Sequence, residues 1–214
     1  MEREHLSCAD CGSVGCVDGA GTRPPFCTTD ALEPGELERA LETANQPENR
    51  AVMQAAARTE YEGYCKLTRV EEIMDFARRM GFTRIGVATC AGLRRESGAL
   101  ARILRAHGFT VYAIACKAGM ADKSLVGIDE DCKAVGANMC NPVLQAQYLN
   151  RMDTQLNIVV GLCVGHDSLF YKYAQALTTT LVAKDRVTGH NPAAVLYQLD
   201  GYYSRLLRTD TGAD

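Results

Sequence analysis

The sequence predicts an α/β protein with a Rossmann-like, mostly parallel sheet of about four to five strands, flanked by helices and preceded by a small cysteine-rich module. Two observations support this prediction. From residue 84 onward, short apolar segments alternate with helical ones, a pattern typical of parallel strands joined by right-handed crossovers. Residues 1–31 are instead rich in glycine and cysteine and have too few apolar residues for a core. We therefore expect a cysteine-rich metal-binding module over 1–31 and an α/β domain with a helical lead-in over 32–214.

The helical lead-in is expected over residues 36–81. Within it, Val70, Ile73, Met74 and Ala77 recur at helical spacing. Pro47 interrupts the pattern, and Gly81 is a typical residue at which a helix ends.

Strands and helices alternate in the remainder of the chain. Strands are expected over residues 84–90, 109–116, 156–163 and 178–184, and helices over 92–107, from Pro142 to 152, and from Asp167 or Ser168 to Gln175. The stretch between the second strand and Pro142 is rich in loop residues. Loops longer than about 12 residues in a compact domain are usually functional or disordered.

Composition excludes several classes of function. Hydrophobic residues make up 47% of the 214-residue chain, and its net charge of -3 gives no broad basic surface for nucleic acid. No apolar run approaches the roughly 20 residues of a membrane helix. The N-terminus MEREHLSCADCG is charged where a signal peptide is apolar. We expect a cytoplasmic protein with neither a nucleic-acid nor a membrane partner.

The chain contains ten cysteines. In a reducing compartment structural disulfides are disfavoured, so metal ligation or redox chemistry becomes the leading explanation. The alternative is that some cysteines are small buried hydrophobic residues, and for Cys65 both explanations stay open.

Four of the cysteines form a C-x2-C-x4-C-x10-C pattern at Cys8, Cys11, Cys16 and Cys27. Four thiolates on a short glycine-rich segment can surround a zinc ion or hold an iron–sulfur cluster, and either would order a segment that has no core. Zinc ribbons usually have two paired CxxC motifs and this segment has one, so the spacing does not decide between the metals.

A second group of cysteines follows the predicted strands. Cys90, Cys116 and Cys163 end three of them, and the carboxyl ends of parallel strands share one edge of the sheet, where open α/β folds build their sites. The long loop adds Cys132 and Cys140. Such a cluster suits an iron–sulfur cluster, with one iron open to substrate where only three thiolates bind, and zinc is the competing occupant. Buried packing of these cysteines is the alternative.

Polar residues near the same edge are candidates for further roles. His166 could bind metal or transfer protons, with Asp167 orienting it or capping the next helix, and Lys117 could lower the pKa of the adjacent Cys116 thiol. The candidate binding residues for a small anionic ligand are Lys184, Arg186, His190 and Asn191. A solvated basic loop is the alternative for that segment.

These residues resemble an uncharacterised prokaryotic family, domain of unknown function eighteen-forty-seven, usually described only as metal-binding. The resemblance rests on the cysteine module, GVATCAGL, YAIACKAG and CNPVLQA, and most specifically on GLCVGHD and KDRVTGHNP. It covers nearly the whole chain. It implies that the residues which matter are Cys8, Cys11, Cys16, Cys27, Cys90, Cys116, Cys140 and Cys163.

Three functions remain open from the sequence. The first is an enzyme whose sheet-edge metal centre acts as a Lewis acid or sulfur carrier, with an iron–sulfur cluster on Cys90, Cys116, Cys163 and Cys140. The second is a non-catalytic protein that stores, delivers or senses metal or redox state. The third is a structural zinc in the N-terminal module, with the other cysteines in the core.

Overall fold

The computed structural model of the chain describes residues 7–13 and 15–208. The chain divides into two compact units, Met1–Ala57 and Arg58–Asp214. The first unit contains a 3-10 helix, η1 (Cys8–Asp10), then helix α1 (Glu36–Ala44) and most of helix α2 (Pro47–Gly63), which continues into the second unit. The described residues between η1 and α1, 11–13 and 15–35, form turns and irregular backbone.

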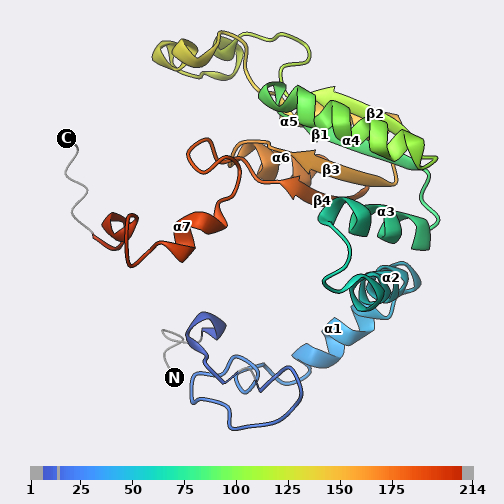
Figure 1. The fold of residues 1–214 in the computed structure, drawn as a ribbon, viewed down its shortest axis with the longest axis vertical. Coiled ribbons are helices and arrows are strands. Elements are labelled where there is room, and N and C mark those ends of the chain that lie inside the picture. Colours follow the sequence, from blue (N-terminus) through green and yellow to red (C-terminus); the bar gives the residue numbers. More distant parts are fainter. Residues whose placement is uncertain (1–6, 14, 209–214) are drawn as a thin grey trace. The chain divides into compact units, whose positions relative to one another are not determined.

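The second unit is an α/β domain (Figure 1). Its four strands are β1 (Arg84–Thr89), β2 (Thr110–Ala115), β3 (Leu156–Val160) and β4 (Leu177–Val182). Its α-helices are α3 (Arg69–Arg79), α4 (Arg94–Ala106), α5 (Pro142–Arg151), α6 (His166–Tyr173) and α7 (Ala193–Tyr197). Its 3-10 helices are η2 (Ala91–Leu93), η3 (Lys123–Val126), η4 (Glu130–Val135) and η5 (Ser204–Leu207).

All strand pairs in the sheet are parallel, and the strand order is β2-β1-β3-β4. Helices α4, α5 and α6 lie between successive strands of the chain, so they form the crossovers that a parallel sheet requires. The predicted fold class, a mostly parallel α/β sheet flanked by helices, is confirmed.

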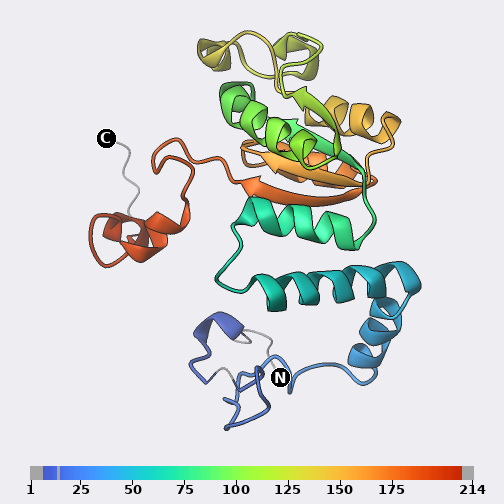
Figure 2. The same ribbon diagram turned by 45° about the vertical axis from the view of Figure 1, so that its right-hand side comes forward.

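Each face of the sheet packs against its own helices (Figure 2). On one face α3 and α4 cover side chains such as Ile85 and Ile158, while on the other α5 and α6 cover Ala88 and Val159. Strand β3 is buried on both faces because it is an inner strand covered by helices on both sides. The two cores hold the carboxyl ends of β1 and β3 in fixed positions.

Local signals explain where two of these helices begin. Thr68 and Glu71 form a capping box at the start of α3, in which each side chain accepts a hydrogen bond from the backbone of the other residue. At α5 the side chain of Asn141 accepts the backbone N–H of Leu144, and Pro142 occupies the first turn. Helix α5 therefore has a fixed start just after Cys140.

One predicted strand is shorter than expected. The apolar run 156–163 continues to Cys163, but β3 ends at Val160 because Gly161 has φ +66, which is incompatible with a strand. A Cβ at Gly161 would lie 2.0 Å from Cδ1 of Leu93, so glycine is also required by packing. Cys163 consequently lies in the loop that leads to α6 rather than at the end of a strand.

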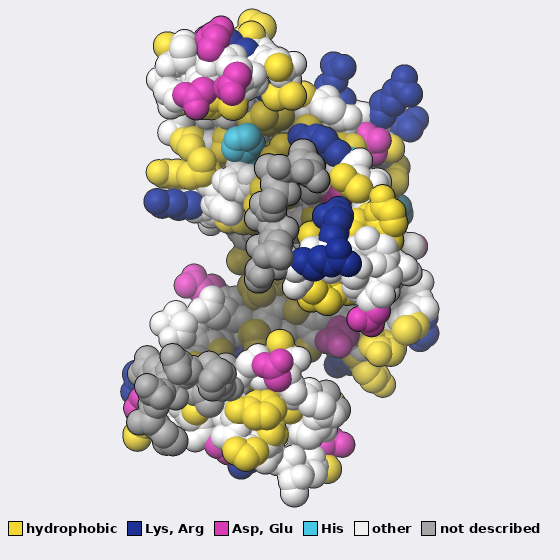
Figure 3. Space-filling view, turned by 90° about the vertical axis from the view of Figure 1, so that its left-hand side faces the viewer, with side chains coloured by type: hydrophobic (Ala, Val, Ile, Leu, Met, Phe, Trp, Pro, Cys, Tyr) yellow, Lys and Arg dark blue, Asp and Glu magenta, His cyan; other side chains and the backbone are white. Residues whose placement is uncertain are grey.

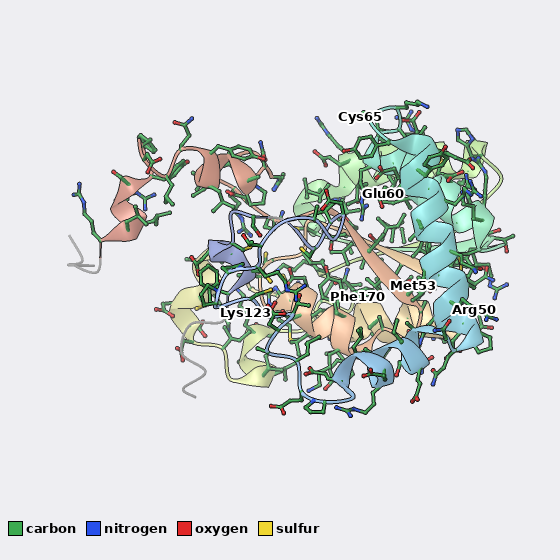
Figure 4. All side chains as sticks on the ribbon, turned by 90° about the horizontal axis from the view of Figure 1, so that it is seen from below. Arg50, Met53, Glu60, Cys65, Lys123 and Phe170 are labelled. Carbon is green, nitrogen blue, oxygen red and sulfur yellow. The ribbon has the colours of Figure 1, made fainter. Side chains whose placement is uncertain are left out.

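The segment of residues 117–141 between β2 and α5 is not without structure, because it contains η3 and η4. Lys123, labelled in Figure 4, is only 6% exposed, and its ammonium donates to the carbonyl of Cys132. Acidic side chains gather at the upper end of the face shown in Figure 3, where this segment lies.

In the part of the chain that the structure describes, no helix is long and apolar enough to cross a membrane.

We predict that Gly86→Ala destabilises the protein by about 2–3 kcal/mol, because overpacking a rigid core has this cost. A Cβ at Gly86 would lie 2.1 Å from Oδ1 of the fully buried Asn157. Gly98→Ala is the matched control, because Gly98 is exposed on α4 and a Cβ added there would meet no atom within 4 Å. It should stabilise by about 0.5–1 kcal/mol. Urea unfolding of both variants checks this, and equal stability of the two would contradict the account of the core.

Candidate metal centre

Backbone hydrogen bonds continue the sheet beyond the last residues of β1 and β2. The N–H of Cys90 donates to the carbonyl of Val160 at 3.0 Å, and the N–H of Cys116 donates to the carbonyl of Thr89 at 2.8 Å. The two cysteines that follow the strands are therefore held side by side at the carboxyl edge of the sheet, as the parallel arrangement requires.

Cys140 reaches the same place from the far end of the segment 117–141. The N–H of Asn141 donates to the carbonyl of Cys116 at 2.8 Å. The Lys117 ammonium donates to the carbonyl of Asn138, and its charge helps to lower the pKa of the Cys140 thiol. These contacts close the segment back onto its starting point, so residues 24 positions apart in the chain become neighbours.

Three thiols at this edge form a chain of contacts. The half-buried Cys90 and Cys140 pack against the cluster that contains the buried Cys116, and each of the three thiols influences the pKa of its neighbour. Backbone amides also point at the sulfurs: the N–H of Ala91 lies 3.3 Å from the Cys116 Sγ, and that of Gly92 lies 3.4 Å from the Cys90 Sγ. The structure thus brings together three of the four cysteines expected at the sheet edge.

This arrangement separates the pKa values of the three thiols. The hydrogen bond from Cys116 lowers the pKa of Cys90 to about 4; burial opposes the shift, and the Gly92 amide and Lys184 reinforce it. The Cys116 thiol also lowers the pKa of Cys140 to about 5; burial opposes this shift, and the charges of Lys117 and His166 reinforce it. The pKa of Cys116 is raised by its hydrogen bonds with Cys140 and Cys90 and by burial.

Cys116 has one thiol proton, which it can donate to only one neighbour at a time. Cys90 and Cys140 therefore compete for the same proton. We expect one of them to be a fully stabilised thiolate in the metal-free protein, while the other depends mainly on its backbone and basic neighbours. A cation that replaced the shared proton would satisfy all three sulfurs together.

Cys163, the fourth cysteine of this edge, has a different partner. Nη2 of Arg186 lies 3.2 Å from its Sγ, and this thiol raises the pKa of Arg186, with smaller effects from Cys90 and Cys140. The side chain of Lys184 passes Gly161 and hydrogen-bonds Cys90. Lys184 and Arg186, expected to bind a small anion, are thus directed at thiols.

A closed turn positions these two basic residues. The carboxylate of Asp185 accepts the N–H groups of Val187 and Thr188, and its pKa is lowered mainly by Thr188. The N–H of His190 donates to the Asp185 carbonyl, and Nδ1 of His190 accepts the Asp185 N–H. His190 therefore holds the turn. Asn191 is exposed beside it and precedes α7, a helix of only five residues.

The catalytic candidates His166 and Asp167 have separate environments. The Asp167 carboxylate accepts the N–H of the adjacent Ser168 at 2.8 Å within the first turn of α6, and the N-cap of this helix, Gly165, has no side-chain cap. His166 lies close enough for its charge to influence Cys140, and its Nδ1 is buried without a hydrogen-bond partner. His166 therefore has a nitrogen lone pair or N–H near the thiols that the protein itself does not use.

Sequence reasoning missed Gln145. This residue is fully buried on α5, and its Nε2 donates to the carbonyls of Thr89 and Ile114. It therefore ties α5 to the ends of β1 and β2, directly below the thiols. A glutamine among apolar residues in PVLQAQYL was the available signal.

The N-terminal cysteines belong to the other unit and are described separately. Cys8, Cys11, Cys16 and Cys27 all line one cavity of about 100 Å³. The thiol of Cys8 lies 2.9 Å from Oγ1 of Thr28. Arg23, which also lines the cavity, is paired with Asp30 at 2.8 Å. The four thiols of the sequence motif therefore face a common space.

The two remaining cysteines, Cys65 and Cys132, are both exposed. Cys65 is exposed at the periphery (Figure 4). Phe170, which is labelled in the same view, is buried between α6 and the sheet. Cys132 is exposed in the segment 117–141. Across residues 7–13 and 15–208, no group of three or more His, Cys, Asp or Glu side chains is already arranged to hold a metal ion. Metal binding at either group would therefore require side chains to turn toward a common centre.

Comparisons with known proteins find one family model and a relative that match this chain. A family model described as "Protein of unknown function (DUF1847)" matches residues 27–181. This range contains Cys90, Cys116, Cys140 and Cys163 but only one cysteine of the N-terminal motif. An uncharacterised protein of Methanocaldococcus jannaschii is 39% identical over 192 residues, which cover 90% of this chain and 94% of that protein. No solved structure matches the chain.

We predict that the metal-free protein has a thiol at Cys90 or Cys140 that reacts with iodoacetamide at pH 6 as fast as at pH 8. A lowered pKa keeps the thiolate present above about pH 5, whereas an ordinary thiol with a pKa of about 8.5 is less than 1% ionised at pH 6. Peptide mass spectrometry after timed alkylation identifies the site. Cys116→Ala removes the proton donor and should restore a rate that rises with pH. Rates that rise about tenfold per pH unit at both thiols in the unsubstituted protein would contradict this assignment.

Proposed function

The chain belongs to the DUF1847 family, and from the geometry of its sheet edge we propose that it is a metal-binding protein with a thiolate-ligated centre at that edge. The observation that carries the proposal is the packing of Cys90 and Cys140 against the cluster that contains the buried Cys116. These three thiols come from segments far apart in the chain and meet at the edge where open α/β folds build their sites. Zinc and an iron–sulfur cluster are both held by such thiolates.

The donor atoms present suit a metal once their side chains turn toward a common centre. Cys90, Cys116 and Cys140 would supply three ligands, and both Cys163 and His166 lie within electrostatic reach of the group. A bound metal would act there as a Lewis acid or, as a cluster, as an electron carrier. The amides of Ala91 and Gly92 donate to the Cys116 and Cys90 sulfurs and can orient these ligands.

Charge compensation supports the proposal further. Each of the three outer thiols has its own basic neighbour, namely Lys184 for Cys90, Lys117 for Cys140 and Arg186 for Cys163. Partly buried thiolates repel one another and lose hydration. Basic side chains from two separate loops stabilise those thiolates and so favour loss of the protons that a metal must displace. A reducing compartment such as the cytoplasm suits a centre of this kind.

The second candidate function is non-catalytic, with a structural zinc in the N-terminal module and redox-sensitive thiols at the sheet edge. Two observations favour it. All four N-terminal cysteines line one cavity, and the lowered pKa values of Cys90 and Cys140 are typical of thiols that react with oxidants. Under this alternative, metal would bind only in the N-terminal unit.

The deciding experiment is metal analysis of protein purified without oxygen. We define the edge-only variant as the full chain carrying Cys8→Ser, Cys11→Ser, Cys16→Ser and Cys27→Ser. We expect about one metal centre per edge-only chain, measured as zinc, iron and acid-labile sulfide. Adding Cys116→Ser should abolish that metal, because the central ligand is lost.

Adding Cys132→Ser to the edge-only variant is the matched control and should leave the metal content unchanged, because Cys132 is exposed and lies outside the thiol chain. Far-UV circular dichroism verifies that every variant is folded. An edge-only variant that is folded but free of metal would refute the proposal and leave the structural-zinc alternative.

A further inference from the structure

The ligands available at the sheet edge favour a single metal ion over a cluster. Cys90 and Cys140 both pack against the apolar cluster that contains the buried Cys116, so three thiols gather at this edge. A four-iron cluster is held by four thiolates, each on a different iron, whereas one tetrahedral zinc ion accepts three thiolates and a histidine.

His166 supplies a suitable fourth ligand. Its Nδ1 is buried without a hydrogen-bond partner, which is unusual for a polar atom in a folded protein. The ring lies close enough to Cys140 for its charge to act on that thiol. Its position is fixed, since the His166 N–H donates to the Cys163 carbonyl and Gly165 has φ +82 just before α6. Three thiolates and one imidazole are a common zinc ligand set.

Cys163 is engaged elsewhere. Its sulfur accepts a hydrogen bond from Arg186, whereas the contacts that link the other three thiols all pass through Cys116. The turn at Gly161 takes the backbone out of the sheet before Cys163 is reached. Cys163 therefore forms an arginine–thiol pair at the margin of the site.

We propose, resting on the metal-binding function above, that the sheet edge binds one tetrahedral zinc ion through Cys90, Cys116, Cys140 and Nδ1 of His166, with Cys163 outside the ligand set. On binding, the ion replaces the proton that Cys116 shares with its two neighbours. Cys90 and Cys140 turn toward it from their present contacts, and the buried His166 nitrogen gains the partner that it lacks.

The first test uses the unsubstituted full-length protein. After the protein is saturated with zinc and excess metal is removed, N-ethylmaleimide labelling is followed residue by residue with peptide mass spectrometry. Zinc should protect Cys90, Cys116 and Cys140, while Cys163 should be modified as fast as in the metal-free protein. Protection of Cys163 equal to that of the other three would overturn the ligand set.

The second test is anaerobic cobalt titration of the edge-only variant, in which charge-transfer absorbance in the near ultraviolet reports the number of thiolates and visible bands report tetrahedral geometry. Adding Cys163→Ser should leave both spectra and the affinity unchanged. Adding His166→Gln should weaken cobalt binding about tenfold or more and alter the visible bands while the thiolate absorbance per bound cobalt stays the same. Far-UV circular dichroism of the metal-free His166→Gln form checks its fold.

The outcomes separate this inference from the function on which it rests. A loss of about one quarter of the thiolate absorbance with Cys163→Ser, together with no effect of His166→Gln, would replace the histidine with a fourth thiolate. Iron with matching sulfide in the edge-only variant would overturn the single-ion inference but keep the metal-binding function. Failure of the edge-only variant to bind any metal would overturn both.

Discussion

The parallel arrangement of the four strands is the constraint on which the candidate site depends. Because every strand runs in the same direction, the residues that follow β1 and β2 emerge at one edge of the sheet. The sheet hydrogen bonds continue to Cys90 and Cys116, so these residues inherit the register of the strands. Asn141 then ties the start of α5 to Cys116 and delivers Cys140 to the same point. Three backbone hydrogen bonds thus determine where the thiols meet.

The pKa values of these neighbouring thiols determine how they can bind a metal. The central Cys116 is buried, and its pKa is raised, so it keeps its proton until a stronger competitor arrives. The outer thiols are stabilised as thiolates by that proton and by Lys184 and Lys117. A metal cation is attracted to the outer thiolates and gains the third sulfur by displacing the central proton. Our proposal therefore links the order of the pKa values to the order in which ligands are recruited.

Much of the fold and part of the site were predictable from the sequence, because the alternation of apolar strands and helices predicts a parallel sheet with helical crossovers. That alternation is enough to place Cys90 and Cys116 at one edge of the sheet. It failed at Cys163, since the apolar run LNIVVGLC does not reveal that the chain turns at Gly161, where Leu93 leaves no room for a Cβ. Long-range polar contacts were also hidden. Arg186 contacts Cys163 across 23 residues, and Gln145 reads as a surface residue of a helix although it is fully buried.

The central claim is that the thiols of the sheet edge bind metal directly, and X-ray absorption spectroscopy at the metal edge tests it most directly. The sample is the edge-only variant, loaded with zinc without oxygen, so that no N-terminal thiolate contributes. The account predicts a shell of about three sulfur atoms at roughly 2.3 Å and a lighter ligand at about 2.0–2.1 Å. A zinc ion surrounded only by oxygen or nitrogen ligands would contradict it.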